Sequence, residues 1–174
     1  MTVDAAMDEH PIAQQIQALL EDNGCVFHVS HHPPVRTSEE AAAMRAGYTL
    51  RQGAKAIILR AKVAGQGDRF SMLVFPADKR FDSSKVKQLL NAKDIRFATE
   101  EEVDRLTGGV KPGGVPPFGN LFGLPVFSDE AIFENREIIF NAGRTTSIAM
   151  QSADYRRLAQ PLVCDIVSAG SDRL

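Results

Sequence analysis

A run of twelve residues near the middle of the chain, residues 108–119, limits most strongly what this sequence can fold into. It reads G-G-V-K-P-G-G-V-P-P-F-G and holds five glycines and three prolines. Glycine frees the backbone and proline removes an N–H donor, so the run forms neither a regular helix nor an interior strand. Two uses remain open. The run is either a surface connector or a wall where the backbone approaches a ligand and offers it N–H groups.

The elements predicted on both sides of this loop define the fold class. Capping boxes pair Thr37 with Glu40 and Thr99 with Glu102, each at the start of a helix. Helices are expected at 12–23, 37–48, 82–90, 99–106 and 152–160, where Ser152 is the expected cap, with a helical turn at 130–133. Strands are expected at 25–30, 54–63, 69–76, 95–98, 124–128, 137–141, 147–150 and 163–167.

The order of these elements is irregular, unlike the steady alternation of a doubly wound parallel sheet. We therefore predict an α+β (mixed α/β) fold in which helices surround a curved, largely antiparallel sheet. It forms a single domain over residues 11–168, between a flexible N-terminus (1–10) and a tail (169–174).

Composition and charge narrow the function. The 174 residues carry a net charge of −2 and a pI near 6.1, which argues against non-specific binding of nucleic acid. A small basic patch that touches RNA at one end stays open. Cys25 and Cys164 match no metal spacing, and we expect them to be reduced and buried. No signal peptide or membrane-spanning run is visible, so a cytoplasmic protein without a membrane partner is expected.

Lys55 stands out within the strand A-K-A-I-I-L-R-A-K-V at 54–63. On a strand it shares a face with Ile57 and Leu59, and a lysine on an apolar face needs a partner or a ligand. The alternative is an edge strand from which the ammonium group reaches water. The pair His31-His32 lacks the i, i+4 spacing and the nearby carboxylates of a metal site, so no metal is expected.

Three segments, taken in order, resemble a known family. They are G-A-K-A-I-I-L-R (53–60), L-T-G-G-V-K-P-G-G-V-P-P-F-G (106–119) and F-N-A-G (140–143). Together they resemble the YbaK/ProX family, free-standing relatives of the editing domain inserted in bacterial prolyl-tRNA synthetases, over roughly residues 12–162. The further runs E-E-V-D-R-L-T-G (101–108) and A-D-Y-R-R-L-A-Q-P (153–161) are most similar to the YeaK-type branch.

Members of that family hydrolyse the ester of mischarged aminoacyl-tRNA. The resemblance therefore implies a trans-editing deacylase that acts on the acceptor end of aminoacyl-tRNA without a cofactor. A synthetase or an elongation factor is a further candidate partner. The catalytic residues implied are Lys55, Gly113, Gly114 and Pro117. The substrate-binding residues implied are Phe118, Gly119, Asp129, Asn141 and Gly143.

Two departures bear on the amino acid that is removed. Pro116 stands where many relatives of the YbaK branch have serine, and Asn141 stands where the Ala-tRNA-specific branch has histidine. The YeaK-type branch implies a small amino acid, with serine or threonine first and alanine next. The Asn141 amide can donate to and accept from a hydroxyl, so we expect it to bind the hydroxyl of such a substrate.

An aminoacyl ester is already activated, so its hydrolysis needs positioning and oxyanion stabilisation more than a strong nucleophile. The N–H groups expected to stabilise the oxyanion are those of Gly113, Gly114, Phe118 and Gly119. Lys55 is expected to bind the terminal phosphate or ribose, or to position the substrate. Two alternatives stay open: a catalytically silent module that binds an aminoacylated or free RNA end, and a small-molecule hydrolase or binder.

Overall fold

The computed structural model describes residues 11–34 and 47–169. The helix expected from Thr37, with its capping box to Glu40, lies outside the described residues, apart from its expected end at Tyr48. In the described ranges, no helix is both long enough and apolar enough to cross a membrane.

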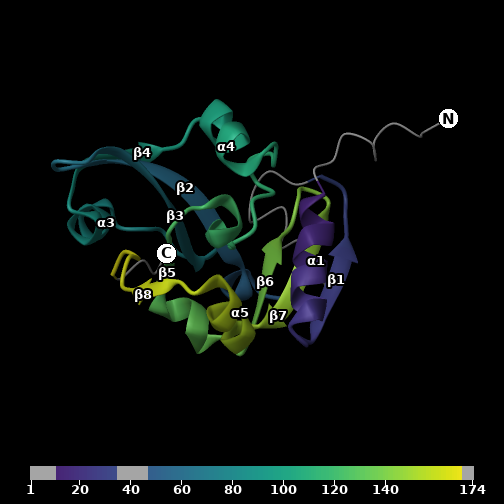
Figure 1. Cartoon of the computed structure of the whole chain (residues 1–174). Helices are drawn as coiled ribbons and strands as arrows, with labels where there is room; N and C mark the ends of the chain where they lie inside the picture. The colour runs from purple at the N-terminus through teal and green to yellow at the C-terminus, as the bar shows by residue number, and fades with distance from the viewer. Residues whose placement is uncertain (1–10, 35–46, 170–174) are drawn as a thin grey trace.

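The elements follow one another in a mixed order, as predicted (Figure 1). The α-helices are α1 (Ile12–Asp22), α3 (Ser83–Leu90), α4 (Glu100–Thr107) and α5 (Ser152–Ala159), and the 3₁₀ turns are η1 (Leu50–Gln52), η2 (Gly119–Phe122) and η3 (Glu130–Glu134). The strands are β1 (Phe27–His31), β2 (Ala54–Val63), β3 (Gly67–Pro76), β4 (Ala92–Phe97), β5 (Val126–Asp129), β6 (Glu137–Asn141), β7 (Thr146–Gln151) and β8 (Leu162–Cys164). The α+β class is therefore confirmed.

The described strands form two sheets, where the sequence predicted one. The larger sheet has the order β4-β2-β3-β5-β8, and the smaller has the order β1-β7-β6. Most pairs are antiparallel, but β5 runs parallel to both β3 and β8. A single parallel bridge from Gly53 to Ile139 joins the start of β2 to β6, and so brings the two sheets together.

The main hydrophobic core lies against one face of β2 and of β6. Ala54 and Ile58 of β2 pack there together with Ile138 and Phe140 of β6. Helix α1 covers this core with Ile12, Ile16 and Leu20, which recur at helical spacing and are at most 1% exposed. Full burial of one such side chain stabilises the fold by about 1.5–3 kcal/mol.

A second apolar cluster lies on the other face of β2. Leu59 of β2 packs there against Leu73 and Phe75 of β3, and Val86 of α3 covers them. Residues that alternate along β2 therefore contribute to different clusters, as the pleat of a strand requires.

The first residues of the helices show which sequence signals predict a helix start correctly. Thr99 and Glu102 form the predicted capping box of α4, and Asp82 accepts from the N–H groups of Ser84 and Lys85 at the start of α3. The prediction that Ser152 caps α5 is wrong. Ser152 is the first helical residue, and Gln151 occupies the cap position without a side-chain hydrogen bond. The chain pairs through β7 up to Gln151, so the helix begins directly at the residue that was predicted to be its cap.

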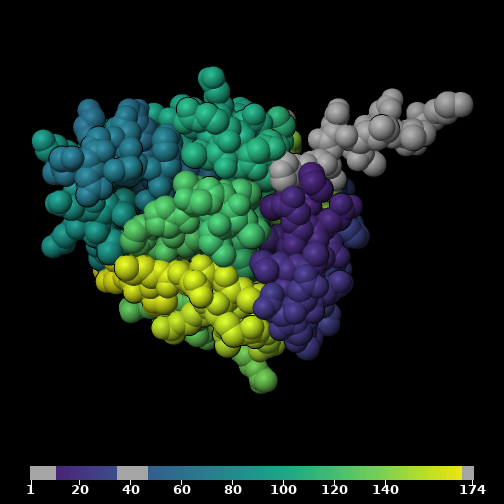
Figure 2. Space-filling model, in the orientation of Figure 1, coloured from purple at the N-terminus to yellow at the C-terminus, as the bar shows by residue number. Residues whose placement is uncertain are grey.

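The glycine- and proline-rich loop packs into the middle of one face of the molecule. In the space-filling view, the green segment that follows α4 is surrounded by the teal α4 region, the purple N-terminal part and the yellow C-terminal part (Figure 2). Its residues Val110 and Phe118 belong to the main core. The loop is therefore anchored in the core through these two side chains and is not a loosely attached surface connector.

Candidate active site

The glycine loop packs directly on the turn between β6 and β7. The N–H of Gly143 donates to the carbonyl of Gly114 at 2.8 Å, and the N–H of Gly114 donates to the carbonyl of Lys111 at 3.0 Å. A Cβ atom on Gly114 would lie 2.7 Å from the carbonyl carbon of Gly143 and 2.8 Å from the nitrogen of Arg144. Gly114 is therefore required for the close packing of two backbones.

Asn141 fixes the position of the neighbouring loop residue. Its Nδ2 donates to the carbonyl of Gly113 at 2.8 Å, and its Oδ1 accepts from Oγ of Ser147 at 3.4 Å. Ser147 Oγ also lies 2.8 Å from Nε2 of His32, at the end of β1. These contacts form a polar chain that runs from β1 through β7 and β6 to the loop. Gly113 has a φ of 88°, a left-handed conformation that favours glycine.

The far end of the loop is anchored in the core by α5. The hydroxyl of Tyr155 donates to the carbonyl of Pro117 at 2.8 Å, and Tyr155 is fully buried. Burial raises the pKa of Tyr155, so its hydroxyl keeps the proton that it donates. The ring of Phe118 contacts the rings of Tyr155 and Phe140 edge to face, at centroid distances of 5.3 Å and 5.6 Å.

Lys55 faces the same side of the sheets as Asn141. Ala54 and Ile58 of β2 and Ile138 and Phe140 of β6 all face the main core. Lys55 and Asn141 alternate with these residues and therefore face away from that core. Each lies two residues beyond the parallel bridge between Gly53 and Ile139. Lys55 is exposed, and its ammonium group makes no hydrogen bond or ion pair with the described residues.

Three residues that the resemblance placed in the binding site have structural contacts instead. Asp129 is 1% exposed, and its carboxylate accepts from the N–H groups of Ala131, Ile166 and Val167. The Phe118 side chain is fully buried. A Cβ on Gly119 would lie 2.8 Å from Cγ2 of Val126, so Gly119 serves the packing of η2 on β5. Gly113, Gly114, Asn141 and Gly143 are brought together as expected.

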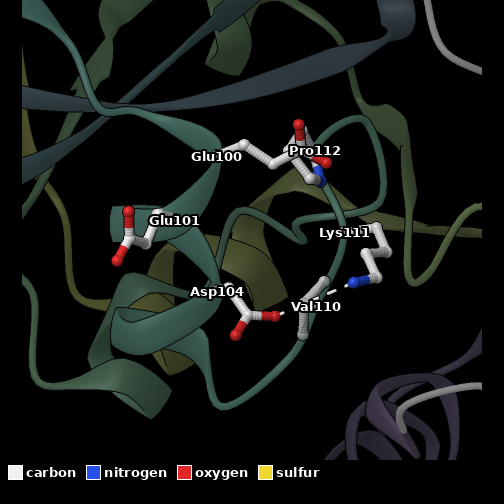
Figure 3. Close-up of a pocket in the computed structure, with 6 residues that line it drawn as sticks. All are labelled: Glu100, Glu101, Asp104, Val110, Lys111 and Pro112. Carbon is white, nitrogen blue, oxygen red and sulfur yellow. Dashed lines mark ion pairs between the residues drawn. The ribbon is translucent and has the colours of Figure 1, made fainter.

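A cavity of about 430 Å³ lies beside the entry to the loop (Figure 3). Glu100, Glu101 and Asp104 of α4 form one side of it, and Val110, Lys111 and Pro112 form the other. The ammonium group of Lys111 lies 3.9 Å from the Asp104 carboxylate, as the dashed line in Figure 3 shows. The carboxylates give this cavity a negative charge, which is unfavourable for the phosphates of an RNA.

The described residues contain no cluster of histidine, cysteine and acidic side chains that could hold a metal ion. The two cysteines are free, as expected, but partly exposed rather than buried. Burial nevertheless raises the pKa of the Cys164 thiol to about 11 and also raises that of Cys25, so neither is an activated nucleophile.

Sequence reasoning missed three residues that hold the site together. Ser147 and His32 extend the polar chain of Asn141, although 115 residues separate them in the sequence. Tyr155 anchors Pro117 from 38 residues away. Only Tyr155 had a signal, because it lies within the run A-D-Y-R-R-L-A-Q-P that pointed to the YeaK-type branch.

Comparison with known proteins defines the class. Residues 32–158 match the family of the aminoacyl-tRNA editing domain, and the chain belongs to that family. This range contains Lys55, the glycine loop, Asn141 and Tyr155, so the whole described site lies within the family's domain. The resemblance inferred from the sequence motifs is thereby confirmed.

Individual relatives agree with this assignment. The chain is 37% identical to the Escherichia coli K12 protein named multifunctional Ser/Thr-tRNA deacylase ProXp-y, over 85% of this chain and 88% of that one. It is 35% identical to a proline–tRNA ligase of Bacillus licheniformis, over 59% of this chain but only 17% of the ligase. A solved structure described as a candidate trans-editing enzyme for prolyl tRNA synthetase superposes with a TM-score of 0.76 at 28% identity, covering 92% of this chain and 99% of that one.

Proposed function

We propose that this protein is a trans-editing hydrolase that deacylates mischarged tRNA carrying a small amino acid, with serine and threonine ahead of alanine. The observation that carries the proposal is the 37% identity, over most of both chains, to a protein named as a Ser/Thr-tRNA deacylase. The acceptor end of an aminoacyl-tRNA is the proposed partner, and the cytoplasm is the proposed location. A synthetase or an elongation factor that hands over the tRNA is a further proposed partner.

In the proposed reaction a water oxygen attacks the ester carbonyl carbon, and the bond between that carbon and the ribose oxygen breaks. The ribose oxygen takes one proton of the water, the other proton passes to solvent, and the amino acid leaves as a carboxylate. Negative charge develops on the carbonyl oxygen, so fixed N–H donors lower the barrier. Among the expected donors, Gly114 N–H already bonds to Lys111, and Phe118 and Gly119 are buried. The exposed Gly113 is therefore the donor that we propose.

Lys55 supplies positive charge on the same side as this donor. An ammonium group can bind the terminal phosphate of the acceptor end, and it also favours negative charge in the transition state. Its four-carbon stem lets the group reach a substrate from an exposed strand position. Asn141 acts on the reaction through the Gly113 carbonyl to which it donates, so we assign it a positioning role.

The decisive experiment is single-turnover deacylation of Ser-, Thr-, Ala- and Cys-tRNA under one set of conditions. The proposal expects the two hydroxyl substrates to be hydrolysed first. Release of Ala or Cys ahead of both would contradict the preference but leave the deacylase function standing. A protein that binds all four tRNAs and hydrolyses none would be a silent binding module.

Lys55→Ala tests the proposed site. We expect normal folding, because an exposed side chain is removed, and a loss of most deacylation. The matched control is Lys62→Ala, which removes an exposed lysine from the same strand at its hairpin end. Equal rates in the two variants would contradict a role for Lys55 in the reaction. A large fall in Tm for Lys55→Ala alone would indicate a structural role.

A further inference from the structure

A second pocket opens on the Lys55 side of β2, about 240 Å³ in volume. We call it the Phe97 pocket. Its lining holds three cations, Lys55, Lys79 and Arg80, and no acidic residue. The rest of the lining is apolar and is formed by Ile57, Phe75, Phe81 and Phe97. A protein with a net charge of −2 thus concentrates positive charge around an aromatic floor.

The cations of the Phe97 pocket have no counter-ions among the described residues. Some cations of α3 and β4 are paired, for example Lys85 with Asp165 at 3.0 Å and Arg96 with Glu102 at 2.7 Å. Neither the Lys79 nor the Arg80 side chain makes an ion pair or hydrogen bond within the described ranges. Unpaired cations that converge on one cavity attract an anionic ligand.

The aromatic floor presents an open ring. Phe81 contacts Phe75 and Phe97 edge to face, with centroid distances of 6.0 Å and 5.8 Å. The contact with Phe81 fixes the Phe97 ring on one side, yet 61% of Phe97 is exposed. It is the one aromatic side chain among the large hydrophobic residues that the described structure leaves exposed. A fixed, exposed ring beside cations is the arrangement with which proteins bind unpaired bases.

The Phe97 pocket is continuous with the proposed active site, because Lys55 belongs to both. Phe97 pairs with Leu59, four residues along β2 from Lys55. At about 3.3 Å per residue, this separation is roughly 13 Å. An amino acid cannot span that distance, whereas a single-stranded nucleotide chain can. The elements of an RNA end, phosphates and bases, also match the cations and the ring.

We infer that the Phe97 pocket binds the unpaired 3′-terminal nucleotides of tRNA, with Lys79 and Arg80 on phosphates and a base stacked on Phe97. The inference rests on the proposed function, because it supplies the path by which an acceptor end reaches Lys55 and the glycine loop. It also accounts for binding by an acidic protein, since the positive charge is local. Stacking on a ring tolerates every base, so the pocket contributes affinity for any tRNA end.

The test is the binding of a labelled, uncharged single-stranded RNA ending in CCA to the full-length protein, followed by fluorescence anisotropy. Phe97→Ala should raise Kd between about five-fold and about a hundred-fold, the range measured for loss of one stacked base. The double variant Lys79→Ala/Arg80→Ala should also raise Kd. It should lower the slope of log Kd against log salt by about 0.7 for each phosphate that the variant no longer binds.

Two matched controls make the result decisive. Lys87→Ala/Lys93→Ala removes the same charge from α3 and β4, and Leu162→Ala truncates a hydrophobic residue that is 51% exposed on β8. The controls should bind like the unchanged protein. Equal losses in the two charge variants would show a diffuse electrostatic effect and overturn the inference. Loss in the Lys79/Arg80 variant with full binding by Phe97→Ala would also overturn it, because such a site needs no ring.

The RNA carries no amino acid, so this measurement does not depend on hydrolysis. Normal deacylation with no effect of the pocket variants on RNA binding would reject the Phe97 pocket alone. RNA binding that depends on the pocket, in a protein that hydrolyses no aminoacyl-tRNA, would support the pocket and reject the proposed reaction.

Discussion

Gly114→Ala tests whether the packing of the glycine loop on the β6–β7 turn controls the reaction. The added Cβ would lie 2.7 Å from the Gly143 carbonyl carbon, whereas ordinary contacts begin at about 3.4 Å. Both partners are backbone, so the two segments must separate by about 0.7 Å. That separation strains the hydrogen bond from Gly143 N–H to Gly114, and it moves the Gly113 carbonyl away from Asn141.

Two magnitudes follow from this displacement. Overpacking costs about 1–3 kcal/mol of stability, and each kcal/mol lowers Tm by roughly 2–4 °C in a chain of this size. A shift near 1 Å in a positioning element can cost about a hundred-fold in rate. We therefore expect kcat/KM for Ser-tRNA to fall by about ten-fold to a hundred-fold, with a Tm that is lower by about 2–12 °C.

The assay is single-turnover deacylation of Ser-tRNA beside thermal unfolding by circular dichroism. Gly65→Ala is the control. It lies in the β2–β3 hairpin with a φ of 75° and nothing within 4 Å of the added Cβ, so any loss of Tm there comes from left-handed strain, which Gly114 does not have, and not from a steric contact. Gly114→Ala with an unchanged rate and Tm would refute the argument that this contact fixes the loop.

Two further changes test the supports of the site and of α4. Tyr155→Phe removes the donor to the Pro117 carbonyl and leaves a buried acceptor unsatisfied, so ΔG of unfolding should fall by about 1–3 kcal/mol; an unchanged denaturation midpoint would contradict this anchor. Hydrogen bonds from Arg96 and then from the Thr99 N–H lower the pKa of Glu102 to about 2, so its stabilisation is complete above its unfolded pKa and is lost as pH falls toward 2. Glu102→Gln should therefore reduce the fall of Tm between pH 4.5 and pH 2, and identical Tm profiles would exclude this contribution.

The local elements could be predicted because their signals lie within a few residues. The capping box of Thr99 and Glu102 fixes the start of α4, and the turn after Val63 fixes the β2–β3 hairpin. The division into two sheets could not be predicted. It depends on pairings between distant segments, such as β1 with β7 and β5 with β8. The alternation of apolar and polar residues predicts that a segment is a strand, but it does not show with which other strand the segment pairs.

The same limit applies to the site. The glycines of the loop and Lys55 could be singled out, because their residue types conflict with their surroundings. The sequence could not show what each glycine contacts, and Gly114 proves to face the Gly143 backbone. The sequence also could not show that Asp129 has a structural role and does not line a pocket. Its role depends on three N–H groups, two of which lie 37 and 38 residues away.

Asn141 is the residue for which the structure changes the expected result. The sequence predicted that its amide binds the substrate hydroxyl, so that Asn141→Ala would narrow the preference for serine over alanine. In the structure Nδ2 donates to the Gly113 carbonyl and Oδ1 accepts from Ser147. Loss of these bonds frees the loop for every substrate alike.

We therefore expect Asn141→Ala to lower single-turnover rates on Ser-tRNA and Ala-tRNA by similar factors. Each neutral hydrogen bond contributes about 1 kcal/mol, which corresponds to about five-fold. Ser147→Ala is the companion variant, because it removes the bond to Oδ1 together with the contact to His32 but leaves the bond from Nδ2 to the Gly113 carbonyl, so it should give a smaller loss of the same kind. A selective loss on Ser-tRNA, with Ala-tRNA unchanged, would mean that Asn141 contacts the hydroxyl after all. It would then be a specificity residue, and another residue would have to hold the loop.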